Sequence, residues 1–171
     1  MMKFLLNCKA IIFYLRSYPA NIFRRISRYL NPTKQEFVKI IKPDLYYPGK
    51  FIWKDKKTTG INNKDYYKGK IILLVNKNTI SRSEYTVMSL QTAPNVLTIG
   101  NQIAGADGTV SSFELIGGYK TSMTSLGVYY QDFSETQRKG VKIDIEVQPT
   151  IHGIKAGRDE ILEKAIKFVN E

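Results

Sequence analysis

Apolar and polar residues follow one another along the chain in blocks that predict strands and helices in turn. Residues 9–16, 70–76 and 95–100 are short, almost continuous apolar runs, typical of strands that are covered on both faces. Between these runs, residues 22–30 and about 82–92 carry apolar positions at helical spacing. Strands and helices that alternate in this way predict an α/β domain with a parallel core.

Two polar residues are expected to cap helix N-termini. Asn21 follows Pro19, which ends the first apolar run, and precedes the amphipathic segment 22–30. Asp159 precedes the last amphipathic segment, 160–170. The chain is therefore expected to open with strand, turn and helix, and to close with a helix.

The other segments carry weaker patterns. Residues 31–68 contain several prolines and glycines and predict only short strands or loops. After Gly108 the pattern changes to short alternating runs, which predict a meander or an extension of a sheet. With 171 residues, 43% of them hydrophobic, the chain is long enough for one substantial core and too short for two ordinary domains. We expect a single domain over residues 1–171.

The formal net charge of +11 favours anionic partners such as nucleic acids, anionic membranes or acidic proteins. The basic residues are scattered, however, and no run of them reaches five. No ribonucleoprotein, zinc-finger or basic-zipper pattern is present. We therefore expect a basic soluble surface and no nucleic-acid partner. A nucleic-acid-binding module remains an alternative, and it would require an affinity that falls steeply with salt.

The beginning of the chain could be mistaken for an export signal, but its sequence predicts none. Asn7 and Lys9 interrupt its apolar residues, and the stretch before Cys8 is far shorter than the roughly seven residues of a signal core. No apolar run approaches the ~20 residues that span a bilayer, so no membrane span is expected. The single cysteine excludes an internal disulfide and a cluster of cysteine metal ligands, and it leaves the compartment open.

Ser81 stands where the apolar run 70–76 gives way to the predicted helix. A tight turn between a strand and a helix can expose a nucleophile and direct backbone N–H groups at the same point. A serine in this position is more often a helix cap. The turn by itself leaves both roles open.

The segment TISRSE resembles the Ser-x-x-Glu nucleophile motif of the C-terminal-processing, or tail-specific, serine proteases and their tricorn-core relatives. Ser81 and Glu84 occupy the two named positions. Further segments resemble the family in the same order, and together they cover about residues 9 to 170. These segments are AIIFYLRSYP, VLTIGNQIAGADG, LIGGYKTSMTSLGVYY and GVKIDIEVQPTIHGIKAGRDEILEKAI.

This resemblance implies a fold, a reaction and a set of site residues. The fold would be a crotonase/ClpP-like core of repeated strand–helix units, with an added antiparallel strand extension and a C-terminal helix. The activity would be that of a serine-type endopeptidase that binds a polypeptide as an extended strand, with no cofactor and no metal. Ser81 would attack the peptide carbonyl. The backbone N–H groups of Arg82 and, by position, Ala20 would stabilise the oxyanion.

The sequence departs from the family pattern at the general base. Ala106 stands where many tail-specific proteases have a lysine, which excludes a Ser–Lys dyad at this place. The tricorn-like branch uses a histidine that precedes the matched region. The chain's one histidine, His152, lies in a turn before the last helix, where a surface or capping role is expected. Without a base, a serine hydroxyl is a poor nucleophile at neutral pH.

Two further departures affect the surroundings of the nucleophile. Tyr14 stands where the family strand has an aspartate, next to the loop that carries Ala20. Gln137 occupies the place of a glutamate that orients the catalytic network in tricorn-like members. Glu135, two residues away, is an alternative for that role, although a solvated loop charge is the simpler interpretation.

These departures define the expectations for the whole chain. We expect a fragment that lacks the family's N-terminal part and is weakly active or inactive by itself. A non-catalytic peptide-binding remnant of the same fold is the alternative. Because the strand over 10–15 would lose its neighbours, the fragment is expected to self-associate through an exposed sheet edge. Full-length relatives are commonly exported, but the sequence does not fix where this chain is located.

Overall fold

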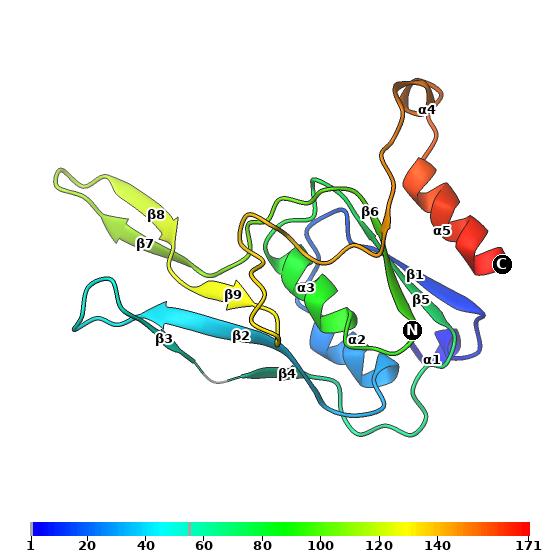
Figure 1. Cartoon of the computed structure of the whole chain (residues 1–171), viewed down its shortest axis with the longest axis horizontal. Helices are drawn as coiled ribbons and strands as arrows, with labels where there is room; N and C mark the ends of the chain where they lie inside the picture. The colour runs from blue at the N-terminus through cyan, green and yellow to red at the C-terminus, as the bar shows by residue number, and fades with distance from the viewer. Residues whose placement is uncertain (1, 55) are drawn as a thin grey trace.

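The computed structural model describes residues 2–54 and 56–171, and Figure 1 shows a mixed α/β fold. Its central sheet has four strands in the order β1 (Ala10–Tyr14), β5 (Lys70–Val75), β6 (Val96–Gly100) and β10 (Ile145–Glu146). Every neighbouring pair in this sheet is parallel. The prediction of an α/β domain with a parallel core is thereby confirmed.

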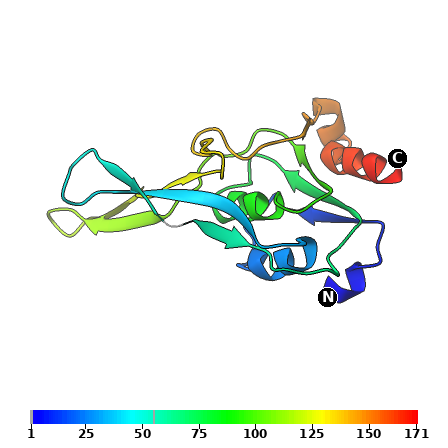
Figure 2. The ribbon, with the colours of Figure 1, turned by 60° about the horizontal axis from the view of Figure 1, so that its bottom comes forward.

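Helices cover both faces of the central sheet because its middle strand is apolar on both sides. The side chains of Ile71 and Val75 belong to the core cluster that includes residues of α2 (Phe23–Leu30) and α3 (Arg82–Leu90). The alternate residues Ile72 and Leu74 pack against Ala165 and its neighbours in α5 (Glu160–Asn170). Figure 2 shows α5 and α2 on opposite sides of this sheet.

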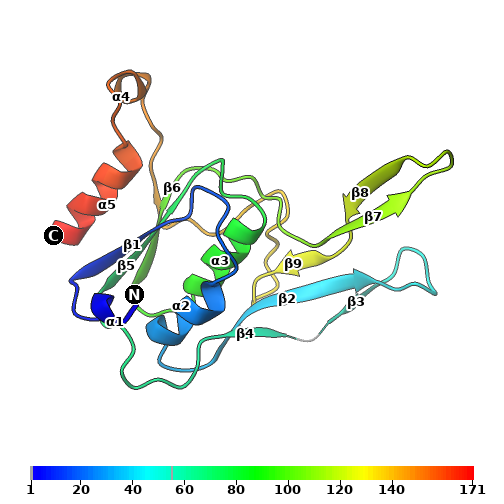
Figure 3. The same ribbon diagram turned by 180° about the vertical axis from the view of Figure 1, so that it is seen from behind.

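A second, antiparallel sheet covers α2 and α3 from outside. Its longest strand, β2 (Gln35–Pro43), pairs with β3 (Phe51–Trp53), β4 (Lys57–Thr59) and β9 (Gly127–Tyr129). Figure 3 shows α2 and α3 between the two sheets. The expectation of only short strands or loops over 31–68 is therefore wrong for β2. The strand carries a register shift between Glu36 and Val38. Its apolar residues therefore do not follow a regular two-residue alternation from which the strand could be predicted.

Two hairpins project from the same end of the molecule (Figures 1 and 2). One joins β2 to β3, and the other consists of β7 (Val110–Glu114) and β8 (Lys120–Thr124), which among the described strands pair only with each other. Every residue of β7 and β8 is exposed. The strand extension predicted after Gly108 is thus present as a separate hairpin, together with β9 in the second sheet.

Of the two predicted helix caps, the structure confirms only the one near the C-terminal end of the chain. The carboxylate of Asp159 accepts the N–H of Leu162 at 3.1 Å, as a cap of α5 should. The prediction for Asn21 is wrong, because α2 begins at Phe23 and Ile22 occupies the capping position without a side-chain hydrogen bond.

The remaining helices, α1 (Met2–Leu5) and α4 (Ile151–Lys155), are short. In the described part of the chain, no helix has the length and apolar character needed to cross a membrane.

The first strand lies at the edge of the central sheet. Ile11 is its buried residue, whereas Tyr14 is 61% exposed. The apolar run predicts a strand that is covered on both faces, but the end of β1 is exposed. The outer edge of β1 has no paired strand within residues 2–54 and 56–171.

Candidate active site

Hydrogen bonds fix the turn that leads from β5 to Ser81. The N–H of Thr79 donates to the carbonyl of Asn76 at 2.8 Å, and the hydroxyl of Thr79 accepts the N–H of Asn76 at 3.0 Å. The same hydroxyl donates to the carbonyl of Leu15 at 3.0 Å. The turn is therefore anchored to the carboxyl end of β1, where the family resemblance places the loop with Ala20.

Ser81 has a backbone conformation that a helix cap does not need. It occupies the N-cap position of α3 with φ 53° and ψ −115°, outside the regions open to most residues. An ordinary N-cap residue has β-region dihedrals. Such strain costs on the order of 1–3 kcal/mol and is typical of functional turns, including those that expose a nucleophilic serine.

Glu84 joins Ser81 to the loop that carries Ala106. The Glu84 side chain is fully buried, and its Oε2 accepts the N–H of Ser81 at 2.8 Å and the N–H of Ala106 at 3.0 Å. Burial raises the pKa of this carboxyl, and the bonds from Ser81 and Ala106 oppose that shift. Because both N–H groups meet one oxygen atom, residue 106, where many relatives have a lysine base, lies beside Ser81.

Ser83 ties the start of α3 to the end of β1. It is fully buried, and its hydroxyl donates to the carbonyl of Leu15 at 2.6 Å. The hydroxyl of Thr79 donates to the same carbonyl. No role was predicted for Ser83 from the sequence, where the one signal is a second small polar residue in SRSE.

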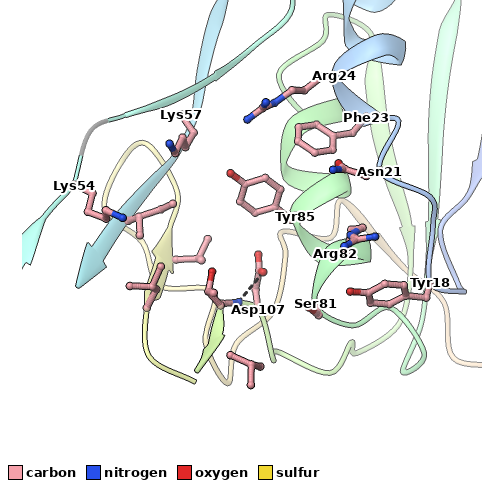
Figure 4. Close-up of a pocket in the computed structure, with 16 residues that line it drawn as sticks. Tyr18, Asn21, Phe23, Arg24, Lys54, Lys57, Ser81, Arg82, Tyr85 and Asp107 are labelled. Carbon is pink, nitrogen blue, oxygen red and sulfur yellow. Dashed lines mark hydrogen bonds between the residues drawn. The ribbon is translucent and has the colours of Figure 1, made fainter. Parts of the chain in front are cut away.

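A cavity of about 610 Å³ opens next to Ser81 (Figure 4). Ser81, Arg82 and Asp107 line it, together with Tyr18 and Asn21 from the loop after β1. Arg82 is the first residue of α3, so its N–H has no acceptor within the helix. The guanidinium of Arg82 lies over the ring of Tyr18, 5.2 Å from the ring centre.

Ala20 lies in the same loop, between Tyr18 and Asn21. It is exposed, and its carbonyl accepts the N–H of Ile22. Tyr14, at the end of β1 where the resemblance implies an aspartate, packs beneath the guanidinium of Arg16, 4.4 Å from the ring centre. Arg16 also forms two hydrogen bonds with Asp159, which holds the end of β1 against the start of α5.

Asp107 is a buried acid in the wall of the cavity. Its side chain is 4% exposed, and its Oδ1 accepts the N–H of Gly108 at 2.8 Å. Its Oδ2 has no hydrogen-bond partner among the described residues. Burial raises the pKa of Asp107 to about 7, and the nearby Glu84 carboxylate adds to the shift. The sequence pattern marked Asp107 and Gly108 only as turn residues, so this acid was missed.

The remaining candidates lie around this cavity or away from it. The Gln137 side chain approaches Gly108, and its Oε1 is buried without a partner among the described residues. Glu135 is exposed and pairs with Lys139 at 3.1 Å. His152 is exposed on α4 and is not among the described residues that line the cavity. Within the described residues, no three His, Cys, Asp or Glu side chains are grouped so as to hold a metal ion.

Among known protein families, the model described as peptidase family S41 matches residues 25–147. A comparison with curated proteins returned no match.

Several solved structures share the fold. A presumed peptidase from Parabacteroides merdae superposes with a TM-score of 0.86 at 20% identity, covering 98% of this chain and 54% of that one. The photosystem II D1 C-terminal processing protease gives a TM-score of 0.61 at 17% identity, covering 84% and 36%. The tricorn protease gives a TM-score of 0.62 at 16% identity, and the match covers 98% of this chain and 16% of that one. Identities this low show a common fold only.

The chain spans about half the length of the Parabacteroides merdae protein and a smaller part of the other two. The segments that resemble the family by sequence and the matched region of the family model overlap over residues 25–147.

Proposed function

Because the chain belongs to peptidase family S41, we propose that it forms a serine-type endopeptidase domain in which Ser81 attacks the peptide carbonyl. The observation that carries this proposal is the strained backbone of Ser81 in the wall of a cavity. A residue that merely caps a helix gains nothing from a conformation that costs on the order of 1–3 kcal/mol. The substrate would be a polypeptide bound as an extended strand.

Two backbone N–H groups would stabilise the oxyanion that forms during attack. The N–H of Arg82 directly follows the nucleophile and has no partner within the helix. The N–H of Ala20 would come from the loop after β1. Donors that are already in place stabilise developing charge without reorganisation in the transition state. The two N–H groups would thus stabilise the negative charge as it develops on the carbonyl oxygen.

The general base is the part of this machinery that the chain lacks at the matched position. Ala106 lies beside Ser81 but has only a methyl group to offer. Lys54 and Lys57 also border the cavity, and Figure 4 places them across it from Ser81. We therefore propose that the chain by itself is weakly active or inactive.

The surrounding assignments follow the same family pattern. Gln137 would orient the catalytic network from its place beside Gly108, and Glu135 is the alternative for that role. The fold would be a crotonase/ClpP-like core with the strand extension and the C-terminal helix, formed by one domain over residues 1–171.

A non-catalytic peptide-binding remnant is the second candidate function. The alanine at position 106 favours it, because a serine without a base retains the cavity and the oxyanion donors but loses most of its nucleophilicity. Such a protein would bind extended peptides and leave them intact.

Labelling with a fluorophosphonate probe tests the proposed nucleophile. We expect slow labelling that maps to Ser81 and disappears in Ser81→Ala, with Ser122→Ala, at an exposed serine of β8, as the control. Strong labelling of the unmodified chain that is lost in Ser81→Ala would contradict the missing base. Labelling that persists in Ser81→Ala would contradict Ser81 as the nucleophile, and complete absence of labelling would favour the remnant.

A further inference from the structure

Four cationic side chains line the cavity beside Ser81. Arg24 comes from α2 and Arg82 from α3, whereas Lys54 directly follows β3 and Lys57 begins β4. They come from three separate parts of the sequence, so the scatter of basic residues along the chain conceals this grouping. Figure 4 shows Arg24 and the two lysines around one side of the cavity, with Arg82 nearer to Ser81.

The four cations are not neutralised by the carboxylates that the structure describes. The ion pairs among residues 2–54 and 56–171 involve other lysines and arginines. Asp107 is the one carboxyl group among the described residues that line the cavity. Burial raises its pKa to about 7, so below neutral pH it carries little negative charge to oppose an anionic ligand.

The other walls of the cavity strengthen the attraction for an anion. Tyr85 lies between Arg24 and Asp107 in Figure 4, and burial raises its pKa to about 12, so its hydroxyl remains a hydrogen-bond donor at neutral pH. Phe23 packs edge-on against Tyr85 with ring centres 5.5 Å apart. Val128 and Leu126 add apolar surface. Clefts with charge of one sign and apolar walls focus the electrostatic potential.

We propose that this cavity recognises a carboxylate of the bound peptide, so that the chain prefers peptides with an acidic group next to the segment held at Ser81. This inference rests on the proposed function, because it takes the cavity as part of a peptidase site. An acidic side chain and a C-terminal carboxylate share this chemistry. A glutamate or aspartate within an extended peptide is the occupant that the volume of about 610 Å³ accommodates together with its neighbours.

Binding of short labelled peptides tests the inference without requiring catalysis. Eight-residue peptides, capped at both ends and differing at one central position as Glu, Gln or Lys, are titrated with the unmodified chain at pH 6 and followed by fluorescence anisotropy. We expect the Glu peptide to bind about tenfold more tightly than the Gln peptide, and the Lys peptide to bind most weakly.

Substitution of two cations of the cavity tests whether the preference for the Glu peptide arises there. Arg24→Gln/Lys57→Gln should reduce the preference for Glu over Gln to about twofold or less. Both side chains are exposed, so the fold should tolerate their replacement. Lys155→Gln/Lys164→Gln, exposed residues of α4 and α5 outside the described cavity wall, removes the same charge and should keep the full preference.

A further peptide separates the two sources of the carboxylate. The Gln peptide with a free C-terminus is compared with its amidated form. A gain for the free form alone would assign the site to a C-terminal carboxylate, and a gain for the capped Glu peptide assigns it to an acidic side chain. Equal binding of all the peptides, no binding, or a preference that both double variants lose equally would overturn the inference.

The outcome is independent of the nucleophile test. A preference for Glu in a chain that the fluorophosphonate fails to label would leave the recognition site standing and reject the catalytic role. Labelling of Ser81 without any preference for a carboxylate would do the reverse.

Discussion

At the scale of single residues, the backbone of Ser81 distinguishes two roles that its side chain leaves open. A serine before a helix is a frequent cap, and the sequence alone could not separate a cap from a nucleophile. The dihedral angles of φ 53° and ψ −115° favour the nucleophile, because a cap has no need of them. The family resemblance singled out this turn, whereas the dihedral angles of Ser81 are visible only in the structure.

The strain at Ser81 should be measurable as lost stability. Ser81→Gly relieves it, because glycine accepts positive φ, whereas Ser81→Ala keeps it. We expect Ser81→Gly to be more stable than Ser81→Ala by about 1 kcal/mol in urea denaturation. At Ser134, which does not have a positive φ, the alanine variant should instead be more stable than the glycine variant. Equal stabilities at position 81 would argue against a strained turn.

Asp107 should lower the stability of the fold at high pH. Its pKa rises from 3.8 to about 7 on folding, so the folded state becomes less stable as the pH increases through that interval. Asp107→Asn keeps the acceptor for Gly108 and removes the buried charge. We expect it to raise the free energy of unfolding at pH 8 by about 2–4 kcal/mol, with the difference vanishing near pH 4.

Urea denaturation at the two pH values checks this result. Asp65→Asn, at an exposed site, serves as the control and should change the free energy of unfolding little at either pH. Two results would contradict this prediction: a lower free energy of unfolding for Asp107→Asn than for the unmodified chain at pH 8, or a difference between the two that does not change with pH. Either would show that the folded protein stabilises the charged Asp107 carboxylate.

At the scale of elements, strands with a strong apolar pattern were the predictable part. The sequence located β1, β5, β6, α3 and α5, whose apolar residues meet a single core. It missed the length of β2, because that strand is irregular and buries its apolar residues against helices on one side. It also missed the cap of α2, where Asn21 faces the cavity and leaves the helix end to Ile22.

Ser83 should couple β1 to α3. Ser83→Ala removes a buried donor and leaves the carbonyl of Leu15 with the Thr79 hydroxyl alone. We expect the free energy of unfolding to fall by about 1–3 kcal/mol in urea denaturation, and any labelling of Ser81 to slow. Ser83→Thr retains the hydroxyl and should recover part of both effects. Unchanged stability in Ser83→Ala would remove Ser83 as the link between these elements.

At the scale of the whole molecule, large exposed apolar side chains are concentrated on the two hairpins, and β1 has an unpaired edge among the described residues. Ile116 and Tyr46 at the hairpin tips are 103% and 90% exposed. A two-stranded hairpin such as β7–β8 is at best marginally stable by itself in water. The family resemblance foresaw the open edge at β1, whereas the projecting hairpins could not be seen in the sequence, because their pattern is equally typical of strands packed in a sheet.

We propose that the chain associates with further copies of itself through these surfaces. Light scattering at tens of micromolar should give a mass above the 19.6 kDa of one chain, and the mass should fall on dilution. Phe113→Ser/Ile116→Ser should shift the distribution towards single chains, whereas Lys164→Gln should not. A monomer at every concentration would contradict the proposal.

Restoring a base beside Ser81 tests most directly that the chain carries a nucleophile turn without its proton acceptor. The measurement is the rate of fluorophosphonate labelling at Ser81 in Ala106→Lys. Residue 106 is exposed, and its N–H meets the same Glu84 oxygen as that of Ser81. Labelling should accelerate about a hundredfold over the unmodified chain, and not in Ala104→Lys or Ser81→Ala/Ala106→Lys. No acceleration, or acceleration that survives Ser81→Ala, would contradict the assignment.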